Sequence, residues 1–259
     1  DDDEGRVFRS GADEADYVAL VLSSLSASLD RPDLAPPRDR AHLRQLWLGR
    51  ATAPGPAPEG AAFFDDGGYS VLRHRVAGHN SIMVLDHGPL GYLSIAAHGH
   101  ADALAIWWHV DDQPVFIDAG TYLYHSGGTD RDRYRGTAVH NTLCLGDADQ
   151  SKISGAFNWS RKARAKRVPM SETTGGLCAE ALHDGYRPLG VEHRRKLALA
   201  VPDGYLVVDR LVGRPQDPTL PLRIRWVLDP TVSAQPVGTR VELRLNGSPL
   251  AGIEAELGV

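Results

Sequence analysis

Short apolar stretches, each four to seven residues long and bounded by turn residues, recur along the chain from residue 69 onwards. Stretches of this length and spacing are typical of β-strands and too short for most helices. They are Tyr69–Arg75, Ser81–Asp86, Leu104–Val110, Val115–Asp118, Thr142–Leu145, Arg194–Ala200, Tyr205–Asp209, Arg223–Leu228 and Val241–Leu245. Asn246-Gly247 is a strong turn signal and predicts one more strand over 252–257. The pattern predicts an antiparallel β-sandwich.

The first sixty residues follow a different pattern. From Ala12 to Leu29 apolar residues recur in an alanine-rich context, which predicts a helix that ends before the prolines that follow. A second short helix is predicted over Arg38–Leu48. The stretch 51–60 is rich in Pro, Ala and Gly and is interpreted as a stiff linker. We therefore expect a helical segment with a linker in residues 1–60 and a β-sandwich in residues 61–259.

Composition excludes several functional classes. The chain has 259 residues, of which 42% are hydrophobic and 24% charged, as in an ordinary globular protein. Its formal charge of −5 argues against a general nucleic-acid binder. No apolar run of about 18 residues predicts a transmembrane segment. Cys144 and Cys178 allow at most one disulfide, although two small buried thiols are favoured.

A cluster of potential metal ligands lies between residues 98 and 141. His98 and His100 are separated by one glycine, so an extended backbone would place both imidazoles on the same side. Asp118 and His140 follow in later strand-like stretches. Two imidazoles and a carboxylate suit zinc, with a fourth position for water or a substrate atom. For any single histidine, a buried structural role would be the better interpretation.

Simple hairpin geometry does not bring these ligands together. A tight turn at Asp112-Gln113 would pair Asp118 near Trp107. His100 would then lie about seven residues further along the strand, roughly 20 Å away at about 3.3 Å per residue. We therefore expect residues 98–102 to bend back across the sheet.

The combined motifs resemble those of a known family. His98-Gly-His-Ala-Asp-Ala-Leu is followed by Phe116-Ile-Asp-Ala-Gly-Thr-Tyr-Leu-Tyr, then by Arg133-Tyr-Arg-Gly-Thr-Ala-Val-His-Asn-Thr, and finally by Gln150-Ser and Phe157-Asn-Trp. In content and order these segments resemble the C-terminal β domain of heparinase II/III-like polysaccharide lyases. The resemblance covers roughly residues 60–200 and is far more specific than an isolated His-x-His.

The resemblance implies a fold, a reaction and a location. Family members place an α/α toroid before this β domain, so the helical segment would be the end of a toroid. The chain begins with Asp1 and no initiator Met, which favours an internal piece of a longer protein. The implied activity is β-elimination on an acidic, uronic-acid-containing polysaccharide such as a glycosaminoglycan or alginate. The implied location is periplasmic, secreted or at the cell envelope.

The resemblance also implies roles for individual residues. His100, Asp118 and His140 match the zinc ligands, and His98 matches a histidine that faces the substrate and takes part in catalysis. Tyr124, Tyr134 and Arg135 are expected to line the substrate cleft, where a guanidinium suits a carboxylate. The family takes its main catalytic tyrosine, a histidine and an asparagine from the toroid. We therefore expect little lyase activity from this chain alone.

Several alternatives remain open at this point. Asn141 is expected either to orient His140 or to cap a turn. The basic segment 161–167 is interpreted equally well as a contact for an acidic polymer or as a solvated strand face. A zinc-stapled β-sandwich that binds polysaccharide without cleaving it is the main competing function. A cupin-like metal enzyme is a more distant one, and it would be expected to use iron.

Overall fold

The computed structural model of the chain describes residues 17–35, 58–76, 78–92, 94–111, 113–123, 128–169, 177–200 and 204–256. Contacts between Cα atoms divide the chain into two compact units, of which the smaller holds Asp2–Glu59 and the larger Gly60–Val259. Within the described residues, no helix has both the length and the apolar character needed to cross a bilayer.

The smaller unit contains helix α1 (Tyr17–Leu29) and a 3₁₀ turn, η1 (Pro32–Leu34). Asp30 directly after α1 has a left-handed φ of 53°, which ends the helix. The described helix lies inside the range predicted from the sequence. The second predicted helix lies wholly outside the described residues, as does most of the predicted linker. The assignment of this unit to the end of a toroid stays a prediction.

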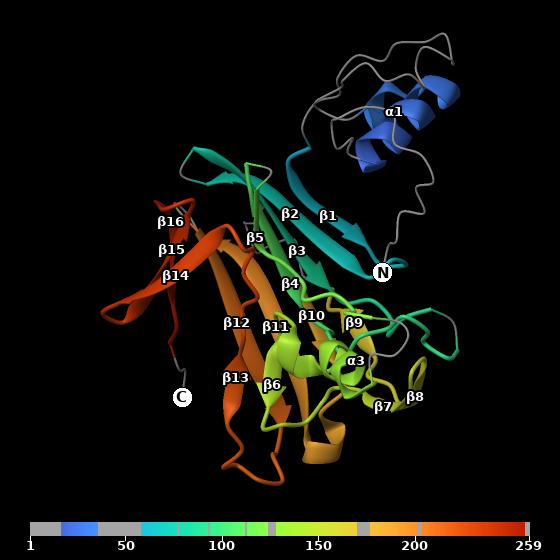
Figure 1. The fold of residues 1–259 in the computed structure, drawn as a ribbon, viewed down its shortest axis with the longest axis vertical. Coiled ribbons are helices and arrows are strands. Elements are labelled where there is room, and N and C mark those ends of the chain that lie inside the picture. Colours follow the sequence, from blue (N-terminus) through green and yellow to red (C-terminus); the bar gives the residue numbers. More distant parts are fainter. Residues whose placement is uncertain are drawn as a thin grey trace. The chain divides into compact units, whose positions relative to one another are not determined.

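The larger unit begins with a five-stranded antiparallel sheet in the order β1-β2-β3-β4-β5 (Figure 1). Alternation of buried and exposed positions makes these segments strands. In β3, for example, Ser81, Met83 and Leu85 are buried and their neighbours are less so. The strands are β1 (Gly60–Phe64), β2 (Tyr69–Val76), β3 (His79–Asp86), β4 (Ile106–Val110) and β5 (Gln113–Phe116).

A second antiparallel sheet, in the order β12-β11-β10-β9, packs against the first. Leu72 and Leu85 from the first sheet meet Ala179 and Leu197 from the second in one core cluster. This arrangement confirms the predicted antiparallel β-sandwich. The strands are β9 (Ala165–Arg167), β10 (Cys178–His183), β11 (Val191–Ala200) and β12 (Gly204–Gly213).

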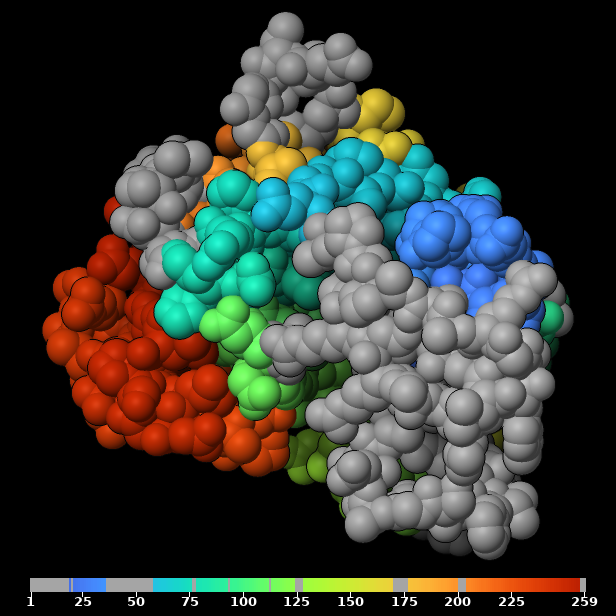
Figure 2. Space-filling model, turned by 90° about the horizontal axis from the view of Figure 1, so that it is seen from above, coloured from blue at the N-terminus to red at the C-terminus, as the bar shows by residue number. Residues whose placement is uncertain are grey.

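Smaller elements complete the larger unit. A third sheet of β14 (Val232–Val237), β15 (Arg240–Leu245) and β16 (Ser248–Glu254) forms a lobe of its own, orange to red in Figure 2. Its Leu243 packs on Val115 and Phe116 of β5. The remaining elements are β6 (Leu143–Leu145) paired with β13 (Leu222–Ile224), the hairpin β7 (Lys152–Gly155) and β8 (Asn158–Arg161), helix α3 (Gly128–Arg135), and the 3₁₀ turns η2 (Thr137–Val139) and η3 (Arg187–Leu189).

Several elements differ from the sequence-based expectation. The last strand begins at Ser248, not at residue 252, because pairing with β15 resumes directly after the Asn246-Gly247 turn. Helix α3 has no apolar face to predict it, and buried Arg131 and Arg135 attach it to the carbonyl oxygen of Ala156 instead. Strands β1, β7, β8, β10 and β14 were also absent from the prediction, whereas β9 lies in the basic segment 161–167 that was interpreted as a strand. Cys144 and Cys178 are not joined by a disulfide.

Candidate metal centre

The segment that carries His98 and His100 is not an extended strand. His98 lies in a turn with a φ of +60°, and His100 follows in irregular backbone. The expectation that both imidazoles share one side of a strand is therefore wrong. A Cβ added at Gly91 would lie 2.7 Å from the backbone of Gly99. The two backbone segments approach this closely because both positions are glycines. Tyr92 N donates to the oxygen of residue 97 at 3.0 Å across the base of this loop.

The chain then reverses direction between Asp102 and Ala105. Ala105 N donates to the carbonyl oxygen of Asp102 at 2.8 Å, and Leu104 has a φ of +63°. Two further hydrogen bonds, Leu104 N to Asp86 O and Asp86 N to Ala105 O, attach the turn to the end of β3. The bend required by the sequence argument is therefore present, and it places Asp102 next to Asp86.

Asp118 and His140 form a hydrogen-bonded pair. Asp118 follows β5, where its Oδ1 accepts a hydrogen bond from Gly120 N at 2.8 Å. Its Oδ2 lies 2.6 Å from Nδ1 of His140, whose side chain is fully buried. Because a carboxylate accepts only, Nδ1 carries the proton of this bond. The other ring nitrogen of His140, Nε2, is buried and has no hydrogen-bond partner within the described part of the chain.

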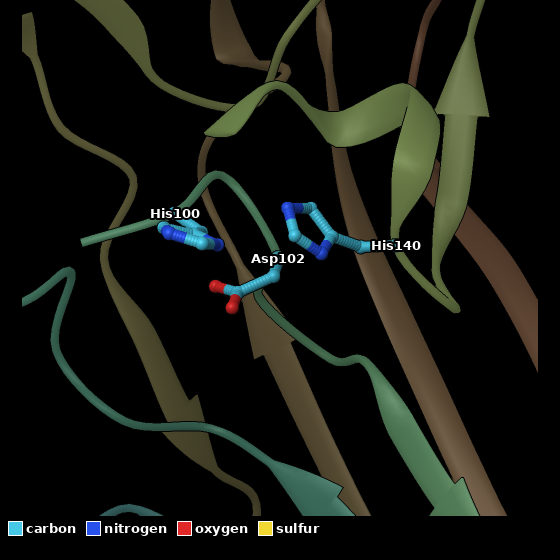
Figure 3. A group of neighbouring side chains, drawn as sticks. All are labelled: His100, Asp102 and His140. Carbon is cyan, nitrogen blue, oxygen red and sulfur yellow. The ribbon is translucent and has the colours of Figure 1, made fainter. Parts of the chain in front are cut away.

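The unpartnered nitrogen belongs to a compact group of potential ligands. One ligand atom from each of His100, Asp102 and His140 lies within 4.8 Å of the others. In the view of Figure 3 the side chain of Asp102 lies between the two imidazole rings, whose centroids are 5.2 Å apart. The structure thus brings together two of the three predicted zinc ligands. Asp118, the third, contacts His140 but is not part of this compact group.

Asn141 and Arg195 hold the backbone around the group. The Asn141 amide donates to Ile106 O and Ile117 O, both at 2.8 Å, so it joins the start of β4 to the end of β5. Arg195, fully buried, donates to Leu104 O and to the carbonyl oxygen of Asn141. Asn141 therefore positions the segment next to His140, and Arg195 was not found from the sequence. The signal available in the sequence was an arginine within the predicted strand Arg194–Ala200.

The two histidines have pKa values shifted in opposite directions. Burial, together with the neighbouring His140, lowers the pKa of His100 to about 4. Burial alone would lower the pKa of His140, but the hydrogen bond to Asp118 and the nearby Asp102 outweigh it and raise the pKa. For Asp118, burial alone would raise the pKa, and the hydrogen bond from His140 outweighs it and lowers the pKa. A neutral His100 leaves a nitrogen lone pair free for a metal.

Two further carboxyl groups of the site are buried and have raised pKa values. Burial, together with the nearby carboxylate of Asp102, raises the pKa of Asp86 to about 8. Burial also raises the pKa of Asp102 to about 6, although His140 opposes the shift. Removal of carboxylates from water is costly unless a cation pairs with them. The two imidazoles and surrounding carboxylates therefore form a donor set that fits a divalent cation such as zinc.

A small cavity adjoins the group. Its volume is about 20 Å³, enough for about one water molecule, and its lining includes Asp86, His100, Asp102 and Gln150. The Gln150 amide nitrogen donates to Ala103 O at 3.1 Å, whereas its Oε1 is buried without a partner in the described residues. The cavity thus provides polar room beside His100 and Asp102.

The side chain of His98 is exposed and lies beside aromatic rings. Its ring centroid is 5.8 Å from that of Phe157. Tyr134 stacks on Tyr122 with ring centroids 5.3 Å apart, and Tyr122 is 54% exposed with a left-handed φ of 66°. Tyr122 was missed in the sequence, although it directly follows the Asp-Ala-Gly-Thr segment. Tyr124, also predicted to line the cleft, lies outside the described residues.

Arg135 occupies a structural position. Its side chain is 1% exposed, and it donates to Gly155 O, to Ala156 O and to Asp132. These donors are used within the fold and are not turned toward a ligand. The predicted role of Arg135 in binding a substrate carboxylate has no support from this placement.

The basic residues of segment 161–167 make different contacts. Arg161 donates to the carbonyl oxygens of Asp149, Gln150 and Gly185 inside the fold. Arg167 pairs with the exposed carboxylate of Asp65 at 2.5 Å. Arg161 and Arg167 are therefore used in contacts within the protein, whereas Lys162, Arg164 and Lys166 are exposed.

Comparisons with known proteins agree on one family. The family model described as heparinase II/III-like, C-terminal, matches residues 56–253. A solved structure of heparinase III is 22% identical over 74% of this chain and 28% of its own, with a TM-score of 0.56. Heparan sulfate lyase HepC from Pedobacter heparinus is 17% identical over 86% of this chain and 31% of its own, with a TM-score of 0.59. The chain thus spans less than a third of the length of these structures. No curated protein matches the chain.

Proposed function

Since this chain belongs to the heparinase II/III-like C-terminal family, we propose that it is the metal-bearing part of a polysaccharide lyase. The proposed reaction is β-elimination on an acidic, uronic-acid-containing polysaccharide. The proposed cofactor is zinc, bound by His100 and His140 together with a carboxylate from this site. Two imidazole nitrogens and one carboxylate, with a position left for water or substrate, make up a common catalytic zinc site.

One observation carries the proposal. His100 and Asp102 lie in one loop and His140 in a distant segment, yet one ligand atom from each lies within 4.8 Å of the others. The buried Nε2 of His140 has no hydrogen-bond partner among the described residues, and such an atom is costly unless a ligand occupies it. Asp118 adds negative charge beside the two imidazoles, which a divalent cation would offset.

The elimination needs an acid, a base and a charge-stabilising group around one sugar. A base removes the proton at C5, negative charge develops on the neighbouring carboxylate, and an acid protonates the leaving oxygen at C4. His98 is exposed and is the imidazole of this chain best placed to exchange a proton with a bound sugar. A bound zinc ion would supply Lewis acidity and fixed positive charge beside the site. Because the side chains of His100 and His140 are held within the fold, they would keep their positions as substrate binds.

Aromatic side chains provide a surface for the sugar. Tyr122 and Tyr134 stack on one another, and Tyr122 is 54% exposed. An exposed aromatic ring offers an apolar face to a sugar and a hydroxyl to its polar groups. We assign the predicted role of substrate contact to this tyrosine pair, with Tyr134 in the half-buried position.

The rest of the catalytic machinery is proposed to come from a longer protein. The chain covers 28% and 31% of the lengths of two solved relatives, heparinase III and a heparan sulfate lyase. We propose that a preceding toroid supplies the main catalytic tyrosine. The 259 residues alone are then expected to bind metal but to cleave polysaccharide only weakly.

Metal content tests the proposal directly. We expect elemental mass spectrometry to find close to one zinc per chain in the purified protein, and none in His100→Ala. His74→Ala is the matched control, because His74 is an exposed histidine on β2 of the same unit. A folded wild-type protein that takes up no zinc would overturn the proposed metal centre.

Activity then separates a lyase from a binding module. With the toroid joined to this chain, uronate polymers should yield an unsaturated product that absorbs ultraviolet light, and His98→Ala should lower its rate of formation. Zinc binding and polysaccharide binding without any unsaturated product would favour the module that binds without cleaving. Rapid cleavage by the 259 residues alone would contradict the proposed need for a toroid.

A further inference from the structure

We propose that the outer face of the second sheet, on the side turned away from the core, is a binding surface for an acidic polysaccharide that is separate from the candidate metal centre. The inference rests on the substrate class of the proposed function and adds a second place where such a polymer contacts the chain. We call this surface the basic face. The side chains that define it are Lys166, Arg194, Lys196 and Arg210.

The pairing register of the sheet places these residues next to one another. Lys166 of β9 lies opposite Leu182 of β10. Leu182 in turn lies opposite Arg194 of β11, and Arg194 lies opposite Arg210 of β12. Because directly opposed residues of an antiparallel pair share a face, this row crosses the whole sheet on one side. Lys196 lies two residues after Arg194 on β11 and therefore has the same orientation.

Alternation along β11 turns the basic face away from the candidate metal centre. Arg195 is fully buried, and its guanidinium donates to two backbone carbonyl oxygens next to that centre. Its neighbour Arg194 points to the opposite side of the sheet, since successive side chains of a strand alternate, and is 36% exposed. Lys166 and Arg210 in the same row are exposed. A polymer bound to the basic face would therefore not occupy the metal centre.

The acidic side chains on this side of the sheet already have basic partners. A carboxylate oxygen of Glu180 accepts from Nε of Arg194. Glu192 pairs with Arg187 at 2.5 Å. These carboxylates therefore neutralise Arg194 and Arg187 and leave the other cations of the face available.

Three of the basic side chains remain for a ligand. In the described part of the chain, no carboxylate pairs with Lys166, Lys196 or Arg210. The chain as a whole has a formal charge of −5, so this local excess of positive charge is opposite in sign to the rest of the protein. Charge complementarity thus favours an anionic ligand at this face.

The spacing of the charges suits an extended polymer. Neighbouring strands lie about 4.8 Å apart, close to the length of one sugar unit, so the row from Lys166 to Arg210 spans about 14 Å, or about three sugars. Lys166 and Arg194 are two strand spacings apart, which matches a polymer with a carboxylate on every second sugar. The described outward positions of β10, β11 and β12 carry no aromatic ring on which a nucleic-acid base would stack. The occupant that fits is an acidic polysaccharide.

Carbodiimide coupling on the wild-type chain tests the basic face without any substitution. The reagent forms an amide between a glycan carboxylate and a lysine amine in contact with it, and the sequence has four lysines, Lys152, Lys162, Lys166 and Lys196. With heparan sulfate as the probe, we expect mass spectrometry of the digest to find glycan on Lys166 and Lys196. Lys152, on β7, is the internal control. No coupling at Lys166 and Lys196, or equal coupling at Lys152, would overturn the inference.

Affinity for the same probe provides a matched test on chelated protein. The double variant Lys166→Gln/Arg210→Gln should bind heparan sulfate about 5- to 10-fold more weakly than the wild-type chain, and with a smaller dependence on salt. Arg75→Gln/Arg240→Gln is the control, because it removes the same charge from exposed positions on the first and third sheets. Its affinity should change less than about 2-fold. Equal losses in the two double variants would contradict a defined basic face.

Two further outcomes separate this inference from its alternatives. Duplex DNA that competes as well as unlabelled heparan sulfate would overturn the assignment of a polysaccharide ligand. A lyase whose glycan affinity is unchanged in Lys166→Gln/Arg210→Gln would overturn this inference and leave the proposed function intact. Conversely, a chain that takes up no zinc but binds the glycan through these residues would overturn the proposed metal centre alone.

Discussion

Arg195 and Asp209 form a buried ion pair, and Arg195 contacts the backbone next to the candidate metal centre. Arg195 Nε lies 2.7 Å from Oδ1 of Asp209, and the two side chains are 0% and 8% exposed. The same guanidinium donates to the carbonyl oxygens of Leu104 and Asn141. Leu104 lies two residues after Asp102, and Asn141 directly follows His140. One buried cation thus ties β11 and β12 to both segments that carry proposed ligands.

Replacement of this arginine should be severe. Arg195→Met leaves Asp209 buried without its cation and two carbonyl oxygens without donors, so we expect a loss of about 3–5 kcal/mol in the free energy of unfolding. Arg187→Met is the control, because that side chain is 67% exposed in its pair with Glu192 and should cost less than about 1 kcal/mol. Urea unfolding followed by circular dichroism measures both. Equal losses would show that the buried pair has no special structural role.

Acidification should weaken the contribution of three buried histidines to the stability of the metal-free protein. Burial holds the pKa of His183 and of His193 below the usual value, and that of His100 at about 4. Because each binds a proton more readily when unfolded, this contribution is lost as pH falls below the unfolded pKa of about 6.5, by about 1.4 kcal/mol per pH unit for each histidine. His140, Asp86 and Asp102 have raised pKa values and change stability in the opposite direction.

Thermal unfolding of the chelated wild-type protein and of His183→Gln between pH 7.5 and 5 isolates one of these histidines. As the pH is lowered, the melting temperature of the wild-type protein should fall relative to that of His183→Gln. His183 is a suitable site because its ring bonds His193 at 3.1 Å and accepts a hydrogen bond from Gly185 N. A difference in melting temperature between the two proteins that does not change with pH would contradict the assignment of His183 as buried and neutral.

The loop that carries His98 should depend on the contact between two glycines. A Cβ on Gly91 would lie 2.7 Å from Gly99, and the φ of Gly91 is +62°. Gly78→Ala is the matched control, since its φ is +88° but nothing lies within 4 Å of the added Cβ. We expect Gly78→Ala to cost about 1–2 kcal/mol from backbone strain. Gly91→Ala should cost a further 1–3 kcal/mol or so from crowding and weaken zinc binding.

Equilibrium unfolding and zinc titration of the two alanine variants provide the comparison. Similar stability and zinc affinity for Gly91→Ala and Gly78→Ala would show that the close backbone approach does not position the histidines.

The exposed tyrosine pair should contribute to carbohydrate binding. Tyr122→Ala removes a ring that is 54% exposed and stacked on Tyr134, so we expect the affinity for a uronate oligosaccharide to fall about 3- to 10-fold. Tyr92→Ala is the control, because Tyr92 is 70% exposed and stacks on no aromatic ring of the described residues. Titration calorimetry on the full chain measures both affinities. Unchanged binding by Tyr122→Ala would exclude the pair as a sugar contact.

Local patterns predicted much of the larger unit. Alternation in β2, β3 and β11 and the Asn246-Gly247 turn identified strands within a few residues of their ends, because burial on one face repeats with period two. Helix α3 escaped prediction because two buried arginines, and not an apolar face, hold it. Strand β10 escaped because its buried positions include small Ala179 and Ala181, whose strand preference is weak.

For the candidate site, residue identities were predictable and geometry was not. His98, His100, Asp118 and His140 were selected from the sequence by motif order. The left-handed turn at His98 and the chain reversal at Leu104 were not predicted in detail, because both depend on backbone contacts with Gly91 and with Asp86. Asp102 was present in the motif, but its relation to His140 depends on how distant segments pack.

The sequence by itself determined that this protein is mainly β, that its histidines and carboxylates gather in residues 98–141, and that its motifs are those of one lyase family. Those conclusions follow from periodicity and motif order, which are local properties. Only the tertiary structure decided that Asp102 lies with His100 and His140 while Asp118 bonds Nδ1 of His140. The physical reason is that these distances are set by hydrogen bonds from Asn141 and Arg195 to strands far away in the chain.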